Sequence, residues 1–383
     1  MKKDSVYIDI DSFFWPSNIS DEYMNEQRYG ISFDEESQSF DLLFEQYYLG
    51  FRSSLIICEE TVTSEEKELK ALKDWREICI LSARDYTIKH LNGDFSLPVD
   101  FMWITKMKII NEIKNEYPEA EGIPLKLSMK PRISAYTKNK NTIVFPALLR
   151  TVLNHCNLVL INNAFQSIET DSKIIDRQFL SRFILPYLLF CHDDFSVRNL
   201  PIIGGYSKAA ITMALSYTNL QVMYIFAHEY AHVLLKHFDF ENVSQKSQEI
   251  LENEADDFAL KIILEYIKTD DNYTKNDVFT AIRWLFKYQL IEDSIGKIIV
   301  KNDLKDFLSA YEERRACFQT KIIKRCNITG TSLIDAVGFC SIVEVQSVLY
   351  EYGTELIDKI IHAFNDSEIK GDVEPWWEMI TQK

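Results

Sequence analysis

The sequence lacks the features of a membrane or secreted protein. No run of apolar residues approaches the roughly 18 that a membrane-spanning helix needs, and the longest candidate, Phe183 to Cys191, is about half that length and contains a proline. The chain begins Met-Lys-Lys and reaches Asp4 at once, without the apolar stretch of a signal peptide. Its seven cysteines form no C-x-x-C pair, which fits reduced thiols. We therefore expect a cytoplasmic protein that does not enter a membrane.

Basic clusters are lacking as well. The chain carries 42 lysines and arginines against 58 aspartates and glutamates, a formal net charge of −16. Such a surface repels phosphate backbones, so nucleic acid is not an expected partner.

Glycine and proline are scarce, with 11 and 9 residues in a chain of 383. Long flexible linkers are therefore not expected, and the chain should be rich in helix. A hydrophobic content of 46% can form a large core, and the length suggests two or three structural units.

Residue periodicity predicts mixed α and β structure. The alternation from Val6 to Asp11 predicts a strand, and two β-prone runs around the polar turn 138–141 predict a hairpin. Pro146 is expected to open a helix, because proline is tolerated in a first helical turn. The hairpin strands are expected at 132–137 and 142–145, and helices at 65–88, 147–161, 219–238, 246–268, 277–291 and 332–364.

The segment His228-Glu229-Tyr230-Ala231-His232 carries the chemistry. On an α-helix, histidines four residues apart lie one turn apart on the same face. That spacing lets two imidazoles bind one tetrahedral zinc ion. Glu229 would lie beside the metal, where it can take a proton from a water molecule and pass it to a leaving group.

The residues around this motif are apolar on nearly every side of the helix, which is typical of a buried helix. Burying two imidazoles and a carboxylate without partners is costly, and a metal ion would remove that cost. The alternative is that both histidines are core residues with ordinary hydrogen-bond partners. The apolar neighbours are Val222, Met223, Phe226, Ala227, Ala231, Val233, Leu234 and Leu235.

A third metal ligand is expected from the next helix, in the run Leu251-Glu252-Asn253-Glu254-Ala255-Asp256. Glu252 lies within the apolar stripe of that helix, whereas Glu254 lies about 160° away on the polar face. A carboxylate on a buried face needs a reason, so we choose Glu252 as the ligand and keep Glu254 as the alternative. Asp256, one turn beyond Glu252, is placed to accept a hydrogen bond from a ligand histidine.

His237 needs a separate interpretation. Metzincins place a glycine three residues and a histidine six residues after the second motif histidine, and here those positions are Leu235 and Phe238, so that class is excluded. On a continued helix His237 lies roughly opposite His228. We interpret it as a structural residue, or as one that interacts with the dipole at the helix end.

The pattern HExxH at 228–232, followed by ExxAD at 252–256, resembles that of gluzincin metallopeptidases. It is similar to the M48 peptidases, where a further histidine often stands at the position of His237. It is also similar to the ImmA/IrrE-type metallopeptidases, whose second motif continues with a pair seen here as Phe258-Ala259. A weaker similarity, to the Lit-type phage-exclusion peptidases, rests on HExxH alone. The resemblance covers roughly 126–268 and implies an edge strand near the metal that binds the substrate backbone by strand addition.

We therefore expect an α+β fold, mostly helical, with a zincin-like metallopeptidase core at 126–270 made of a small sheet, the HExxH helix and the third-ligand helix. Regions 1–125 and 271–383 would flank it as an N-terminal α/β region and a C-terminal helical region. The expected function is zinc-dependent hydrolysis of peptide bonds in intracellular proteins or peptides, in a regulatory, stress or phage-defence role. The oligomeric state and the group that stabilises the oxyanion stay open.

Two alternatives to a peptidase remain. One is a catalytically inactive metal-binding scaffold or sensor, and the other is a zinc hydrolase of a non-peptide amide. Glu229 argues against the scaffold, because a structural zinc needs no base and usually takes four protein ligands.

Overall fold

The computed structural model describes the chain mainly over residues 100–128, 132–146, 149–169, 208–239, 245–300 and 318–370, with short stretches within 8–88 and 184–191. Its longer helices are α5 (Asp100–Ile113), α6 (Leu149–Glu169), α8 (Lys208–Leu234), α9 (Gln245–Tyr266), α10 (Lys275–Ile299) and α12 (Leu333–Lys370), and its 3-10 helices are η4 (Pro118–Gly122) and η6 (His237–Asp239). Its strands are β1 (Ile8–Asp9), β2 (Ile31–Phe33), β3 (Leu55–Ile56), β4 (Leu125–Ser128), β5 (Tyr136–Lys138) and β6 (Thr142–Pro146). The prediction of a mostly helical α+β fold is confirmed.

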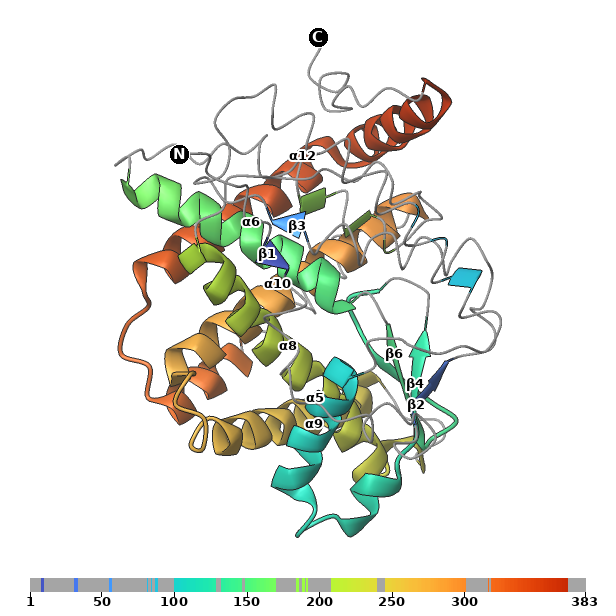
Figure 1. Ribbon diagram of the computed structural model, residues 1–383, viewed down its shortest axis with the longest axis vertical. Coiled ribbons are helices and arrows are strands. Elements are labelled where there is room, and N and C mark those ends of the chain that lie inside the picture. Colours follow the sequence, from blue (N-terminus) through green and yellow to red (C-terminus); the bar gives the residue numbers. More distant parts are fainter. Residues whose placement is uncertain are drawn as a thin grey trace, which may run out of the picture.

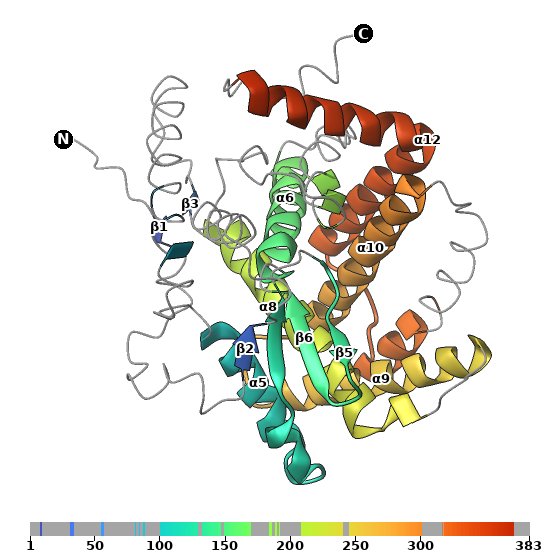
Figure 2. The ribbon, with the colours of Figure 1, turned by 90° about the vertical axis from the view of Figure 1, so that its right-hand side faces the viewer.

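A small mixed sheet lies beside the helices (Figure 1), with strand order β2-β4-β6-β5. β2, β4 and β6 run parallel, and β5 pairs antiparallel with β6, so the predicted hairpin is confirmed. Its turn contains Asn139 and Lys140 at φ 54 and 65, a region that asparagine tolerates well. β5 is an edge strand, with β6 as its one partner among the strands that the structure describes (Figure 2).

Several boundaries differ from those predicted. Pro146 closes β6 instead of opening a helix, and α6 begins at Leu149 and continues to Glu169. α8 starts at Lys208 and ends at Leu234, before the predicted end at 238. It stops because Lys236 adopts a left-handed conformation, φ 57, which ends the helical hydrogen-bond pattern. The helices predicted at 246–268 and 332–364 are confirmed as α9 and α12.

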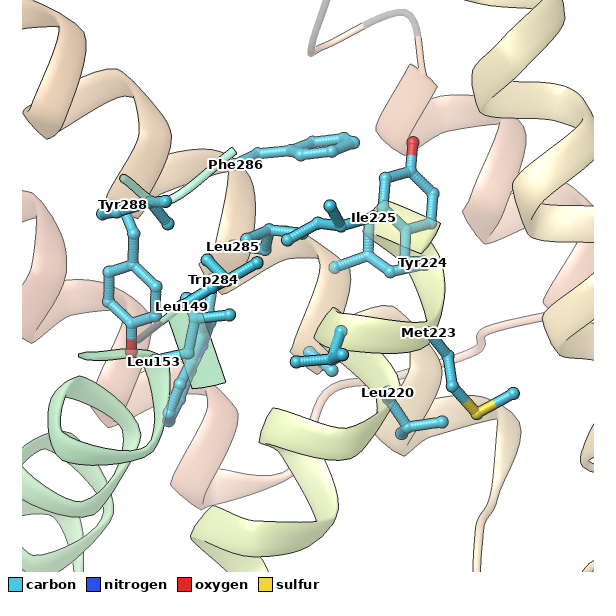
Figure 3. Close-up of a cluster of buried hydrophobic side chains, with 14 of the residues drawn as sticks. Leu149, Leu153, Leu220, Met223, Tyr224, Ile225, Trp284, Leu285, Phe286 and Tyr288 are labelled. Atoms are coloured by element: carbon cyan, nitrogen blue, oxygen red, sulfur yellow. The ribbon is translucent and has the colours of Figure 1, made fainter. Parts of the chain in front are cut away.

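The central helix is α8, which packs against α6, α9 and α10. Figure 3 shows side chains of α8, such as Tyr224 and Ile225, in a cluster with Trp284 and Phe286 of α10 and Leu149 of α6. The cluster of buried apolar side chains extends from Ile109 to Ile360, so all three predicted regions contribute to it. The division of the chain into three regions itself stays a prediction.

A buried polar network joins α6, α8 and α10 within this core. Asn157 donates to Thr218 and Gln221 at 2.9 and 2.8 Å, and it accepts from Tyr288 at 3.0 Å. Gln221 in turn donates to the carbonyl of Ala281 at 3.0 Å. Buried amides are costly when unpaired, so these bonds fix how the three helices fit together.

α10 also supports the edge of the sheet. The buried Glu292 accepts the backbone N–H of Ile133 through Oε1 at 3.3 Å, three residues before β5 begins. This bond ties the chain that leads into β5 to the helical core.

α12 carries the one candidate membrane-spanning stretch among the residues that the structure describes. Residues Leu333–Asp358 are long and apolar enough to cross a membrane, although no such run was expected from the sequence. The same helix packs on α6 and α10, and 44% of that window is buried in the structure. The helix bends at Gly353, which has φ 42 (Figure 2).

The N-terminal predictions are described only in part. Ile8–Asp9 does form a strand, β1, which pairs antiparallel with β3. The helix predicted at 65–88 lies mostly outside the described residues.

Candidate metal centre

Three side chains from two helices converge at the end of α8. Nε2 of His228 and Nε2 of His232 lie 3.0 Å apart. Each of these nitrogens lies 3.5 Å from one carboxylate oxygen of Glu252, which comes from α9. One donor atom from each residue can be chosen so that all three lie within 4.8 Å of one another. The three side chains therefore form a candidate metal-binding group.

The spacing and chemistry of these donors suit a small divalent cation. Ligand atoms bound tetrahedrally at about 2.0–2.1 Å from a zinc ion lie about 3.4 Å from one another. The nitrogen–nitrogen distance of 3.0 Å and the nitrogen–oxygen distances of 3.5 Å are close to that value. Two imidazoles and one carboxylate also leave a coordination position open, as catalytic zinc sites do.

Glu252 lies on the open side of this group. Its side chain is 36% exposed, against 15% and 11% for those of His228 and His232. The expected burial of Glu252 is therefore only partial, but its position beside the histidines is the one that the helix geometry predicted. The alternative, Glu254, is 56% exposed and lies beside His237 instead.

Glu229 occupies the same end of α8 and faces the sheet. Its Oε2 accepts a hydrogen bond from the hydroxyl of Thr137 in β5 at 3.1 Å. Burial raises the pKa of Glu229, and the charge of His228 and the bond from Thr137 oppose that rise. A buried carboxylate with a raised pKa is suited to accept a proton and to give it back.

Asp256 contacts Nδ1 of His228, the ring nitrogen that faces away from the candidate metal-binding group. Nδ1 of His228 lies 3.0 Å from Oδ1 of Asp256, although the N–H is not aligned well enough for a regular hydrogen bond. The fully buried Asp256 also accepts the hydroxyl of Tyr224 at 2.6 Å. The placement of Asp256 agrees with the contact expected from the sequence.

His237 contacts Nδ1 of His232, the ring nitrogen that faces away from the candidate metal-binding group. On a continued helix, His237 would instead lie on the side of α8 opposite His228. Because α8 ends at Leu234 and the chain reverses at Lys236, His237 returns to the helix end. Its Nδ1 lies 2.9 Å from Nδ1 of His232. Burial lowers the pKa of His237 and favours its neutral ring, which fits a structural residue better than a charged residue at the helix end.

The pKa values of the two motif histidines are shifted in opposite directions. Burial alone would lower the pKa of His228, but Asp256 and Glu252 outweigh it and raise that pKa to about 10. Burial, followed by the charge of His228, lowers the pKa of His232 to about 4. Asp256 and Glu252 therefore stabilise a positive charge on His228, while burial and that charge disfavour a positive charge on His232.

Residues from the C-terminal part of the chain pack against Tyr224 and pair with Asp257, next to the groups that contact His228. The ring of Phe318 packs against those of Tyr224 and Phe286, with centroids 6.1 and 5.4 Å apart. Asp257, the neighbour of Asp256, pairs with Lys321 at 3.2 Å. Residues far beyond the predicted core thus contact the outer layer of the site.

A cleft of about 620 Å³ opens where the end of α8 meets η4 and the β5–β6 turn. Val233 lines it from the last turn of α8, Lys236 from the turn after that helix, Asn141 from the β5–β6 turn, and Glu119 and Glu121 from η4. Val233 stands four residues after Glu229 and so lies one turn further along the same face of α8.

Two residues of this arrangement, Tyr224 and Thr137, were not identified from the sequence, and the contact of a third, His237, was not foreseen. Tyr224 stands one turn before His228 on the same helix face, and this spacing could have identified it. Thr137 gave no signal, because only the tertiary fold brings β5 to Glu229. The contact of His237 depends on a backbone reversal at Lys236 that helix periodicity does not predict.

Comparison with known proteins points to a peptidase. Residues 207–297 match the model of the family Peptidase U49. The match covers about a quarter of the chain and includes α8, α9 and the residues of the centre. No curated protein and no solved structure matches the chain significantly.

Proposed function

We propose that this protein is a zinc-dependent metallopeptidase that hydrolyses peptide bonds in intracellular proteins, with its active site at the end of α8. The observation that carries the proposal is the convergence of His228, His232 and Glu252 beside the buried carboxylate of Glu229. The similarity of residues 207–297 to a peptidase family supports it. Such a donor set with a neighbouring base is the arrangement that metal-assisted amide hydrolysis needs.

Each residue of the centre has a role in this proposal. His228, His232 and Glu252 hold the metal, which when bound supplies Lewis-acid chemistry to a carbonyl group and a water molecule. Glu229 takes the proton of the attacking water and later gives it to the nitrogen that leaves when the C–N bond breaks. Thr137 orients Glu229 through its hydroxyl, and Asp256 orients His228.

The edge of β5 that faces away from β6, where no strand that the structure describes pairs, is the proposed binding site for the substrate backbone. The side chain of Thr137 in β5 reaches Glu229, so a peptide paired with this strand would pass the centre. The cleft beside Val233 lies one helical turn further along and could receive a substrate side chain.

The compartment and role are part of the proposal. The four cysteines that the structure describes, Cys156, Cys191, Cys326 and Cys340, are free thiols, which supports a reducing compartment. A cytoplasmic peptidase must be selective, and a regulatory, stress or phage-defence role satisfies that requirement.

Two measurements test the proposal. Elemental analysis of the purified chain should give near one zinc per molecule, and His228→Ala should remove it. Glu229→Gln should keep the zinc but abolish the appearance of new protein termini in cells that express the protein. Glu265→Gln, an exposed change in the last turn of α9, is the matched control and should alter neither.

The outcomes separate the alternatives. A parent protein that takes up no zinc would overturn the metal centre. Zinc without any Glu229-dependent termini would overturn the peptidase activity and favour a non-peptide amide. A cellular phenotype that survives Glu229→Gln would favour a metal-binding scaffold or sensor.

A further inference from the structure

Each of the two histidines, His228 and His232, has a contact at its Nδ1 atom, but the contacting group is chemically different in the two cases. His228 has the carboxylate of Asp256, the usual partner for a metal-binding histidine. His232 has another imidazole, that of His237, which belongs to η6 and is 6% exposed. Nothing in the motif itself requires this second histidine.

We propose that His237 is a positioning residue that fixes the tautomer and ring orientation of His232, with Glu254 as the outer partner of His237. The inference rests on the metal centre of the proposed function. It also gives Glu254, the alternative third ligand, a different task from Glu252.

The positions of the ring nitrogens carry the proposal. If Nε2 of His232 faces the metal, its single hydrogen must be on Nδ1, because a neutral imidazole has one N–H. That Nδ1 lies 2.9 Å from Nδ1 of His237, which must therefore accept the hydrogen bond. The hydrogen of His237 is then on Nε2, which lies 3.3 Å from Oε2 of Glu254.

This arrangement of hydrogens gives the two rings a hydrogen bond, directs the N–H of His237 towards Glu254, and leaves Nε2 of His232 free to bind a metal. The contact between His237 and Glu254 is longer and less well aligned than that between the two rings. Glu254 is also 56% exposed, so water weakens its effect. We therefore assign most of the positioning to His237 and a smaller part to Glu254.

The backbone supports this assignment. Lys236 at φ 57 reverses the chain directly after α8, and this brings His237 back to the last turn of the helix. The rings of His232 and His237 are 5.0 Å apart and nearly perpendicular, at 77°. Phe238 packs at 5.9 Å from the ring of His232 and limits its rotation further.

The test compares zinc affinity in variants that keep or remove the acceptor. His237→Asn places an oxygen where Nδ1 stands and should bind zinc within about threefold of the parent, whereas His237→Leu should bind about 10–100-fold more weakly. Glu254→Gln should lose about two- to threefold, and Glu265→Gln should lose nothing. Affinity is measured by competition with a chromophoric chelator, and the visible spectrum of the cobalt-substituted protein reports ligand geometry.

A structural role for His237 predicts a different pattern. In that case the metal-free variants would lose thermal stability, and Asn would rescue zinc binding no better than Leu. If His237→Leu does not fold, the comparison of His237→Asn with His237→Gln decides, because Gln moves the acceptor to the position of Nε2. Equal zinc affinity in parent and His237→Leu, or in the Asn and Gln variants, would overturn the proposal. A parent that binds no zinc would overturn the proposed metal centre as well.

Discussion

Replacing Glu292 with glutamine should make the protein more stable at alkaline pH. Glu292 is 6% exposed on α10, and its Oε1 accepts the N–H of Ile133 just before β5. Burial raises its pKa from 4.5 to about 8, while the bond from Ile133 and the charge of Arg132 oppose the rise. At neutral pH a mostly uncharged carboxyl group therefore supports the strand that reaches Glu229.

The direction of the pH effect follows from where the proton is bound. Between pH 4.5 and about 8 the folded protein keeps the proton on Glu292 and the unfolded chain loses it. The stabilising contribution is thus complete below pH 4.5 and disappears as the pH rises through about 8. At roughly 1.4 kcal/mol per pH unit, the loss is at most about 5 kcal/mol.

The assay is urea unfolding of the parent and Glu292→Gln in buffers from about pH 5 to about pH 9. Glutamine keeps a carbonyl oxygen for Ile133 but cannot ionise. The two proteins should have nearly equal free energies of unfolding at about pH 5, and the variant should be more stable by about 2–5 kcal/mol at about pH 9. Glu351→Gln, an exposed change on α12, is the control and should show no such trend. A difference that stays constant across this range would refute the argument.

Three further predictions concern the core and the centre. In Gly338→Ala the new Cβ would lie 2.1 Å from the Trp284 ring, so the free energy of unfolding should fall by about 1–3 kcal/mol and the melting temperature should fall with it. Gly330→Ala, where a Cβ would meet nothing within 4 Å, is the control and should show no such loss. Equal losses in the two variants would contradict this prediction. Asp256→Asn should weaken zinc binding about 10–100-fold in chelator competition, and unchanged affinity would argue against its role. Asn157→Leu leaves buried polar neighbours unpaired and should cost about 2–4 kcal/mol in urea unfolding; a neutral change would show the network to be dispensable.

Part of the candidate centre could be predicted because it depends on helix geometry. His228 and His232 stand one turn apart wherever residues 228–232 are helical. The same 100° step places Glu252 and Glu254 on different faces of α9, and the packing of α9 against α8 brings Glu252 to the histidines. The hairpin that supplies β5 was also visible in the sequence, from two β-prone runs around a polar turn.

The boundaries of elements were less predictable. Periodicity continues through residue 238, but the helix ends at Leu234 because Lys236 takes a left-handed conformation. Pro146 fits the first turn of a helix and the end of a strand equally well, and the pairing of β6 with β4 decided between them.

The sequence by itself determined which chemical groups stand on one face of α8 and of α9, because covalent geometry fixes the angle between residues a few positions apart. Only the tertiary structure decided what those groups meet. The bond from Thr137 to Glu229 spans 92 positions, and that from Tyr224 to Asp256 spans 32. Such contacts depend on how α8 packs against β5 and α9, which is set by the burial of many side chains together and by no local pattern.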